Sequence, residues 1–492
     1  MRPINPTTKS FAQLGRFLST EIDIDGNFSG VTSSSGYVEP GDLFIALPGR
    51  KKHGAHFVDE ANNRGASAVL TDSEGAEIIG ERAKVIIQEN PREVSADIAS
   101  WFYGRPFSAM ASVGITGTNG KTTTASLLFQ LWQLQNREVG MIGTVGVSIG
   151  ADQYPTSFTT PEGTELQGIA STMRERALTH MVMEVSSHAL VEKRMLGTHF
   201  QLVAFTNLTQ DHLDFHGDMS SYFAAKSSLF TQEYADRALI NIDDQWGAKL
   251  FAETKIPVES ISRSNPSADW HFSSIDRRSH GYDVAIRGIG GILIEGHIPL
   301  VGLHNLDNAL TAVGLAVASG LDPLAIGNDL SQLRGAPGRL EVINLGQNFL
   351  ALVDFAHTPD AVSRTLSALR EVTEGRIIAV LGCGGDRDSS KRPLMGNALV
   401  AGSDVAIFTS DNPRSEDPDV ILESMLSGKQ ANENLVIEGN RRGAIAIAVS
   451  EANPGDTVIL LGKGHETGQE INGVKHPFDD RLELARAIES LS

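Results

Sequence analysis

Continuous apolar runs alternate along the chain with segments of helical period, and polar, glycine-rich loops follow many of these runs. A run that is apolar at every position predicts a strand covered on both faces, as in a parallel sheet between helices. Such runs occupy the middle of the chain at 111–116, 180–187, 202–208 and 238–243, and its last third at 349–356, 376–385, 404–413 and 456–466. The pattern therefore predicts an α/β protein with two doubly wound units.

Two interruptions of this pattern predict domain boundaries. Glycine and proline break the periodicity in RGAPGRLEVI at 334–343, as they do in a linker, so one boundary falls near Arg339. Arg105-Pro106 marks the other, because it precedes the first strand of the middle unit. The segment before it contains GDLFIALPGR, which predicts a strand and a turn. We expect three domains, at 1–107, 108–338 and 339–492.

Composition narrows the classes of protein that fit. Lys and Arg number 41 against 60 for Asp and Glu, so the formal charge of −19 argues against a protein that coats nucleic-acid phosphates. One cysteine, Cys383, excludes an intrachain disulfide, and no Cys/His cluster offers a zinc site. Without a basic neighbour, Cys383 is better read as a small buried residue than as a nucleophile. No apolar leader or membrane-spanning run is visible, so we expect a cytoplasmic protein.

The strongest local motif is GITGTNGKTTT at 114–124, which lies between a predicted strand and the helical segment TASLLFQLWQL. Backbone N–H groups of such a loop cradle phosphate oxygens, Lys121 neutralises their charge, and the Thr122 hydroxyl can hold Mg²⁺. Five residues rather than four separate Gly114 from Gly120, so an ordinary glycine-rich turn is the alternative. The motif predicts ATP bound through its phosphates.

Other polar residues at predicted strand ends lie within reach of the same sheet edge. Glu184 closes the run HMVME, and His212 follows LVAFTN, so a carboxylate and an imidazole could ligate a metal there. Lys226 lies in the helical stretch SSYFAAKSSLF, whose apolar neighbours indicate a partly buried amine. The alternatives are a loop histidine with local hydrogen bonds and a surface lysine that packs only its stem.

The last unit places three polar loops at the ends of predicted strands: GCGGDRDSSKRPLMG, SDNPRSEDP and LGKGHET. Doubly wound topology brings such loops to one edge. Arg392 and Arg414 are suited to carboxylates, while Asp411 and Glu466 could receive an ammonium group. The set predicts a pocket for a zwitterionic amino acid, although turn formation and solvation would also explain these residues.

Two other motifs do not support a function. EIDIDG at 21–26 lacks the first Asp and the final Glu of a calcium loop. Ser186, Ser187 and His188 place serine beside histidine, but adjacent residues of a strand point to opposite faces and no GxSxG elbow is present. A hydrolase triad is therefore not predicted.

The chain resembles the Mur ligases, the ATP-dependent amide-forming enzymes of peptidoglycan precursor synthesis, over nearly its whole length. The resemblance rests on motifs in the family's order and spacing, namely GTNGKTTT, FTTPEGTELQ, MEVSSHALVEKR, TNLTQDHLDFH, YFAAKSSLF, GLHNLDNAL, GAPGRLE, DFAHTPDA, GGDRDSSKRPLMG, SDNPRSEDP and GKGHE. It implies an N-terminal UDP-sugar-binding domain, a central P-loop ATPase-like domain and a C-terminal, Rossmann-like amino-acid-binding domain.

The resemblance also implies a reaction. ATP with Mg²⁺ would activate UDP-N-acetylmuramoyl-L-alanyl-D-glutamate as an acyl phosphate, and meso-2,6-diaminopimelate would be added to it by a cytoplasmic monomer without a nucleic-acid partner or membrane span. Loops of two domains must then meet around one carboxylate, which predicts closure. DNPR is the form associated with diaminopimelate, whose second carboxylate Arg414 can pair with. Lysine would leave that arginine unmatched.

Site residues follow from the resemblance by position. Catalysis is implied for Lys121, Glu184, His212 and Lys226, and metal binding for Thr122, Glu184, His212 and Lys226. The family's lysine carries CO₂ as a carbamate, which would make Lys226 anionic. Nucleotide contacts are implied for Gly117, Thr118, Asn119, Gly120, Lys121, Thr122, Thr123, Asn305, Arg339, Asp354 and His357. Substrate contacts are implied for Ser35, Thr159, Thr160, Ser186, Glu192, Arg194, Arg392, Asp411, Asn412, Arg414, Gly462 and Glu466.

Three positions depart from the family pattern. Glu192 stands where glutamine is frequent, Phe355 replaces a common tyrosine, and TSSSG lacks the Asp and Arg of the usual DSR signature. Ser35 remains, and residues 50–52 could still meet the diphosphate electrostatically. The alternatives are a lysine-adding ligase, a folylpolyglutamate synthase and a non-catalytic nucleotide-binding protein. DNPR and the separate N-terminal domain argue against the first two, and the full set of site residues against the third.

Overall fold

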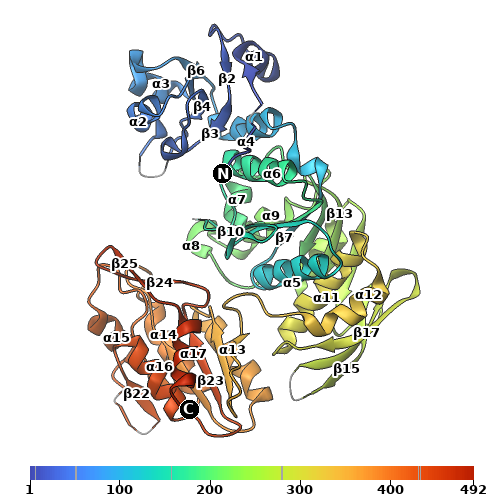
Figure 1. Ribbon diagram of the computed structural model, residues 1–492, viewed down its shortest axis with the longest axis vertical. Helices are drawn as coiled ribbons and strands as arrows, with labels where there is room; N and C mark the ends of the chain where they lie inside the picture. Colours follow the sequence, from blue (N-terminus) through green and yellow to red (C-terminus); the bar gives the residue numbers. More distant parts are fainter. Residues whose placement is uncertain are drawn as a thin grey trace. The chain divides into compact units, whose positions relative to one another are not determined.

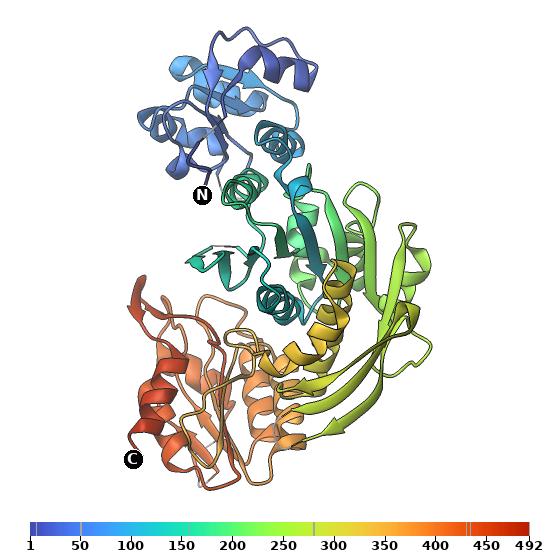
Figure 2. The ribbon, with the colours of Figure 1, turned by 45° about the vertical axis from the view of Figure 1, so that its right-hand side comes forward.

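The structure is a computed structural model that describes residues 1–5, 7–49, 52–156, 158–278, 281–429, 431–432 and 434–491, with Asp214 described in its backbone alone. The chain divides into two compact units (Figures 1 and 2). The first consists of 1–273, 286–294 and 308–327, and the second of 274–285, 295–307 and 328–492.

The first unit begins with a small parallel sheet, in the order β3-β4-β5-β6. Its strands are β3 (Gly30–Thr32), β4 (Asp42–Ile45), β5 (Ala68–Thr71) and β6 (Val85–Ile87), preceded by the pair β1 (Lys9–Ser10) and β2 (Asn27–Phe28). The helices are α1 (Phe11–Leu18), α2 (Val58–Asn63), α3 (Ser73–Ile79) and α4 (Pro91–Phe102). The strand predicted in GDLFIALPGR is confirmed as β4.

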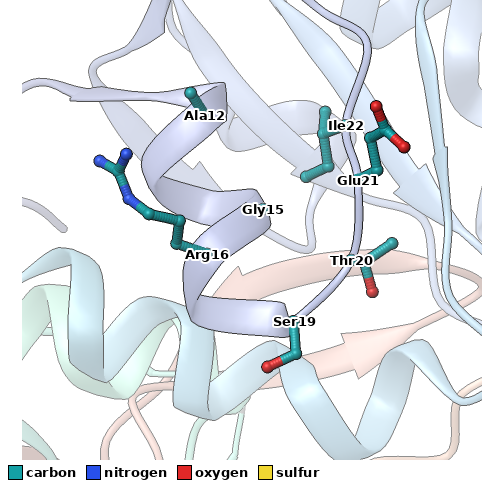
Figure 3. A pocket seen from close by; sticks show the side chains of 7 residues that line it. All are labelled: Ala12, Gly15, Arg16, Ser19, Thr20, Glu21 and Ile22. Carbon is teal, nitrogen blue, oxygen red and sulfur yellow. The ribbon is translucent and has the colours of Figure 1, made fainter.

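Local sequence explains how this part starts. The Ser10 hydroxyl accepts from Gln13 N, and the Gln13 side chain accepts from Ser10 N, which forms a capping box at α1. Beside this helix is an open surface hollow, lined by residues from Ala12 to Ile22 (Figure 3). None of the residues implied in the reaction lines it.

A large sheet follows, in the order β10-β9-β8-β11-β7-β12-β13-β14-β15-β16-β17. It belongs to the first unit as far as residue 273, whereas 274–277, 282–285 and 295–298 of its last three strands are assigned to the second unit. Strands β8 and β11 to β15 run parallel to β7 and to one another, whereas β9 and β10 pair antiparallel. The strands are β7 (Ala111–Thr116), β8 (Val139–Gly143), β9 (Gly146–Ile149), β10 (Asp152–Tyr154), β11 (His180–Glu184), β12 (Phe200–Phe205), β13 (Ala235–Asn241), β14 (Val258–Ser262), β15 (Trp270–Arg277), β16 (Tyr282–Gly288) and β17 (Ile292–Ile298). The predicted middle strands are therefore confirmed as β7, β11, β12 and β13.

Helices cover this sheet. They are α5 (Lys121–Leu134), α6 (Gly163–Glu175), α7 (Ser187–Val191), α8 (Leu213–His216), α9 (Met219–Ser227), α10 (Gln245–Glu253), α11 (Leu303–Ala318) and α12 (Pro323–Asp329). Apolar side chains of α6, α7, α9 and α10 form one core with the sheet. Trp132 of α5 donates from Nε1 to Ser319 Oγ at 2.9 Å, so α5 lies beside the end of α11 (Figures 1 and 2). The four tryptophans of the chain, at 101, 132, 246 and 270, all belong to the first unit.

The second unit has a six-stranded sheet in the order β18-β19-β23-β20-β21-β22, parallel except for β18. Its strands are β18 (Glu341–Val342), β19 (Leu350–Asp354), β20 (Ile377–Leu381), β21 (Val405–Phe408), β22 (Leu435–Ile437) and β23 (Thr457–Leu461), with a hairpin of β24 (Gly468–Ile471) and β25 (Val474–Pro477). Its helices are α13 (Pro359–Val372), α14 (Lys391–Gly402), α15 (Pro418–Leu426), α16 (Arg441–Ser450) and α17 (Asp480–Glu489). The four predicted strands are confirmed as β19, β20, β21 and β23.

Alternate residues of these strands enter two cores. Ala379 and Leu381 of β20 pack with α13, α14 and α15, whereas Ile378 and Val380 pack with α16 and α17. Figure 1 shows α16 and α17 together in red on one side of β23. This double coverage explains why the strands are apolar at every position. In the described part of the chain, every helix is too short or too polar to cross a membrane.

Candidate active site

The glycine-rich loop joins β7 to α5 in the first unit. Gly117 and Gly120 have φ of +146° and +88°, which favour glycine. A Cβ on Gly117 would lie 1.9 Å from Thr206 Oγ1, and one on Gly120 would lie 2.2 Å from Asn308 Oδ1. Lys121 Nζ donates to the carbonyl oxygens of Gly117 and Thr118, both at 2.8 Å. The backbone thus forms a loop at a helix N-terminus with a lysine held against it, an arrangement that suits phosphate.

Glu184, at the end of β11, lies beside the first turn of α5. Its Oε2 accepts from Thr122 Oγ1 at 2.9 Å and from Thr144 Oγ1 at 3.1 Å, and its Oε1 accepts from Thr144 N at 2.8 Å. The carboxylate is 1% exposed. The sequence prediction that these strand ends bring Glu184 close to the glycine-rich loop is therefore confirmed.

The Thr122 hydroxyl and the Glu184 carboxylate fit a divalent cation that also binds phosphate oxygens. Within the described residues, no three His, Cys, Asp or Glu side chains gather as a metal site. A hydroxyl and one carboxylate would leave the other positions of Mg²⁺ to phosphate oxygens and water, as this ion prefers.

Lys226 of α9 is 1% exposed, so it is fully rather than partly buried as the sequence indicated. Its Nζ donates to Gly117 O at 2.7 Å and lies 4.7 Å from the Tyr222 ring centroid. Burial, reinforced by the positive charge of Lys121, holds the pKa of Lys226 well below its ordinary value. The amine is therefore directed at the phosphate loop, in surroundings that favour its neutral form.

His212 is the N-cap residue immediately before α8 and has a left-handed φ of +52°. Its ring lies 4.9 Å from that of His188 and 6.3 Å from that of Tyr222, whose ring faces Lys226.

Ser187 and His188 belong to α7, so the expectation of a strand through 187 was wrong. The Ser186 hydroxyl accepts from Ala189 N at 3.2 Å and caps the start of α7. The continuous apolar run did not indicate this helix start.

A second group of predicted substrate residues adjoins Glu184. Thr160 Oγ1 donates to Glu184 O at 2.9 Å and accepts from Ser186 N at 3.0 Å. Arg194 donates to Thr160 O at 2.9 Å and to Glu192 Oε2 at 2.6 Å. The Thr159 and Thr144 hydroxyl oxygens lie 3.1 Å apart. The structure thus brings together five predicted residues: Thr159, Thr160, Ser186, Glu192 and Arg194.

The TSSSG segment of the N-terminal sheet reaches the same neighbourhood. Ser33 N donates to Thr164 Oγ1 at 3.1 Å, and Thr164 lies in the first turn of α6. Ser35 Oγ donates to Glu60 Oε2 at 2.7 Å. Arg50 and Lys51 of the predicted diphosphate group lie outside the described residues.

Loops at the carboxyl ends of β20, β21 and β23 converge in the second unit, as predicted. Asn412 Nδ2 donates to Glu466 Oε2 at 2.8 Å, and Arg392 pairs with Glu416 at 2.8 Å. A Cβ on Gly462 would lie 2.6 Å from Asp411 Oδ2, so only glycine allows these loops to approach so closely. Buried acidic, amide and arginine groups therefore share one edge of the sheet.

Arg414 is fixed by the β24–β25 hairpin, which sequence reasoning overlooked. Its backbone has φ of +54°; its N–H donates to Glu470 O at 3.0 Å, and its carbonyl accepts from Asn472 N at 2.6 Å. The guanidinium donates to Gly385 O at 2.6 Å and lies 3.4 Å from Glu470 Oε2. Lys463 was also missed, although its place in GKGHE, between Gly462 and Glu466, was a usable signal.

The residues predicted to meet the nucleotide from the second unit gather around Phe355, except Asn305. Arg339 lies 4.7 Å from the Phe355 ring, and His357 Nδ1 is 2.8 Å from Phe355 O. Asp354 accepts from Leu340 N and Ala356 N, both at 2.8 Å, which ties the linker to this loop. Asn305 instead donates to Val301 O at 2.8 Å, near the start of α11.

Cys383 is 5% exposed and its sulfur lies 3.5 Å from that of Met395, which confirms a buried position. Burial raises the pKa of its thiol to about 12. Since the thiolate is the reactive form, we expect native protein to resist a disulfide reagent at pH 8 and denatured protein to react with one equivalent. Rapid labelling of the native protein would contradict this placement.

Comparison with known proteins bears on the whole chain. Family models match residues 27–103 (Mur ligase family, catalytic domain), 115–316 (Mur ligase middle domain) and 338–464 (Mur ligase, glutamate ligase domain). A UDP-N-acetylmuramoyl-L-alanyl-D-glutamate–2,6-diaminopimelate ligase of Streptomyces avermitilis is 43% identical, over 99% of this chain and 98% of its own. The chain belongs to the Mur ligase family. Like its family, it is an ATP-dependent enzyme that forms amide bonds.

Solved structures agree with a three-domain Mur ligase. A structure of a UDP-N-acetylmuramoyl-L-alanyl-D-glutamate–2,6-diaminopimelate ligase is 33% identical, with a TM-score of 0.70 and 99% of each chain covered. A folylpolyglutamate synthase of Mycobacterium tuberculosis, complexed with ADP and AMPPCP, has a TM-score of 0.60 at 18% identity. It shares the fold over 75% of this Mur ligase and 91% of its own chain.

Proposed function

We propose that this Mur ligase adds meso-2,6-diaminopimelate to UDP-N-acetylmuramoyl-L-alanyl-D-glutamate, with ATP as the energy source. One observation carries the choice of amino acid: Arg414 is fixed by the hairpin beside a buried set of ammonium-accepting oxygens. A guanidinium pairs well with a carboxylate, and the distal end of diaminopimelate carries a carboxylate that lysine lacks. The substrate named for the Streptomyces relative supports the same choice.

In this proposal the first unit binds ATP through its phosphates. Backbone N–H groups of residues 117–123 surround the phosphates, and Lys121 compensates their charge. Thr122 and Glu184 would hold Mg²⁺, which supplies charge compensation at the phosphate oxygens. Arg339, Asp354, His357 and Asn305 are proposed to meet the nucleotide from the second unit.

Two covalent steps then form the amide. A substrate carboxylate oxygen takes the γ-phosphoryl group of ATP, so that an acyl phosphate forms and ADP leaves. The amine of diaminopimelate attacks the acyl carbon, loses a proton, and expels inorganic phosphate. Thr159, Thr160, Ser186, Glu192 and Arg194 are proposed to orient the dipeptide, with Ser35 at its nucleotide end.

The surroundings of Lys226 favour the neutral amine that carbamate formation requires. A neutral amine adds to CO₂ and releases a proton, which gives an anionic carbamate. The buried Nζ of Lys226 is directed at the phosphate loop, so a carbamate there would bring negative charge that could, with His212, hold a second Mg²⁺. We include this modification in the proposal.

Steady-state release of ADP and phosphate tests the function. Purified protein with ATP and Mg²⁺ should release both only when the UDP-muramoyl dipeptide and an amino acid are present together. Diaminopimelate should be preferred over L-lysine by at least about a hundredfold in kcat/KM, because only diaminopimelate offers the partly exposed Arg414 guanidinium a distal carboxylate to pair with. Mass spectrometry should find the tripeptide product.

Each other outcome has a definite meaning. Preference for lysine would keep the family and overturn the specificity argument from Arg414. ATP binding without turnover of any amino acid would favour a non-catalytic nucleotide-binding protein. Domain limits at 107 and 338, a cytoplasmic location and a monomeric state belong to the same proposal, and light scattering on the purified protein tests the last.

A further inference from the structure

Lys463 follows β23 and lies between predicted amino-acid-binding residues. Its side chain is 0% exposed. Nζ donates to Asn412 Oδ1 and Glu466 Oε2, both at 3.1 Å, and lies 3.6 Å from Asp411 Oδ1. One buried ammonium thus contacts three side chains, Asp411, Asn412 and Glu466, for which the family resemblance implies contact with substrate.

These contacts fix the orientation of the Asn412 amide. Its Oδ1 accepts from Lys463 Nζ and from Glu470 N at 3.0 Å, so its Nδ2 must face Glu466 Oε2, at 2.8 Å. A flipped amide would direct an NH₂ group at the ammonium and at a backbone N–H. Lys463 therefore acts together with the Glu470 N–H to keep Asn412 Oδ1 on their side and Nδ2 facing Glu466.

The same ammonium changes the charge of the pocket. Asp411 and Glu466 contribute two carboxylates, and Lys463 compensates one of them. The nearby buried pair of Arg441 and Asp480, with Nη2 and Oδ2 2.6 Å apart, adds no net charge. One negative charge is left for one incoming ammonium group.

Lys463 also governs the protonation of these acids. Burial works to raise the pKa of Glu466, but the Lys463 charge and the Asn412 hydrogen bond outweigh it, so that this pKa lies below its usual value. His465 acts in the same direction. Burial raises the pKa of Asp411 despite Lys463 and Arg441. Without Lys463, both carboxyl groups would hold protons at higher pH than they do now.

We propose that Lys463 is a positioning residue that orients Asn412 and Glu466 and sets the pocket's charge to accept a single substrate ammonium. This inference rests on the proposed function. It assigns Lys463 no contact with the reacting atoms, so its removal should act on amino-acid binding rather than on phosphoryl transfer.

The test compares Lys463→Met with wild type and with Lys429→Met, a matched substitution at a lysine of the same unit that bonds Asn397. We expect KM for diaminopimelate to rise about thirtyfold in Lys463→Met, since hydrogen bonds to charged groups are lost. kcat and the KM for ATP should stay within about threefold of wild type. Lys429→Met should match wild type throughout.

A pH profile separates this role from simple structural damage. In Lys463→Met the pKa of Glu466 rises, so KM for diaminopimelate should increase as pH falls through that value, in a range where wild-type KM is flat. Replacing Glu466 as well, in Lys463→Met/Glu466→Gln, removes the titrating group and should flatten the profile again. Lys463→Gln, which keeps a donor, serves if the methionine variant does not fold.

The results also distinguish this inference from the proposed function. Wild type that does not use diaminopimelate would overturn the proposed function. Wild type that uses it, together with a folded Lys463 variant whose KM is unchanged or altered equally at every pH, would overturn the role of Lys463 alone. A loss confined to kcat would do the same.

Discussion

Replacement of Lys226 by methionine is expected to lower kcat about a thousandfold and leave the fold intact. Methionine resembles lysine in length but can form no carbamate, so the proposed metal site loses its anion, a loss typical of electrostatic groups at phosphoryl-transfer centres. The fold should tolerate the change because it removes a buried amine, which is costly to desolvate, and loses its hydrogen bond to Gly117 O. Circular dichroism and steady-state kinetics measure the two effects.

Lys249→Met is the matched control, since Lys249 of α10 is half-exposed and pairs with Glu253. It should keep wild-type kcat. Retention of more than a tenth of wild-type kcat by Lys226→Met would contradict a role for this amine in the reaction.

The lowered pKa of Lys226 also predicts the pH range in which bicarbonate should restore activity. A lysine with its ordinary pKa is protonated at neutral pH and reacts with CO₂ only as pH rises. Burial lowers the pKa of Lys226, so its neutral form is reached at lower pH than for an exposed lysine, and enzyme depleted of CO₂ should regain activity with bicarbonate at neutral pH. Recovery only in alkaline buffer would show that the amine is charged in the folded protein.

Replacement of Arg414 by asparagine should lower kcat/KM for diaminopimelate by two to three orders of magnitude, because it removes the bidentate, charge-assisted hydrogen bonds that a guanidinium can give a carboxylate. Asparagine is chosen because it tolerates the left-handed backbone at this position, where φ is +54°. Activity with L-lysine should not fall, because lysine offers no distal carboxylate. The preference between the two amino acids is therefore the quantity to measure.

Arg364→Asn provides the control, since Arg364 is exposed on α13 and pairs with Asp360 four residues earlier. It should change neither rate. Equal losses for both amino acids in Arg414→Asn would indicate damage to the loop and would remove the basis for specificity at this residue.

Parallel strands were predictable because burial on both faces leaves an unbroken apolar run. Ile377–Leu381 is buried at every position, and its successive residues enter opposite cores. The unbroken apolar run indicates this burial on both faces. Strands β15 to β17 lack this signal, because many of their side chains are exposed and their pairing depends on distant neighbours. The N-terminal strands are too short for a pattern to be distinguished.

Some residues of the candidate site could likewise be placed from the sequence, and others could not. Glu184 could be placed beside Thr122 because strand ends of a parallel sheet share an edge. The complete burial of Lys226 could not be read from α9, since it depends on Gly117, which lies 109 positions away. Lys463 and the hairpin were missed for a related reason: their importance comes from contacts with Asn412 and Arg414, not from their own sequence neighbours.

All four tryptophans lie in the first unit, and this decides how damage to the second can be detected. Intrinsic tryptophan fluorescence will report the unfolding of the first unit and will change little when the second unit unfolds. Denaturation of Lys463 or Arg414 variants must therefore be followed in parallel by far-ultraviolet ellipticity, to which both units contribute. Emission curves that coincide with wild type while ellipticity curves diverge would assign a loss of stability to the second unit.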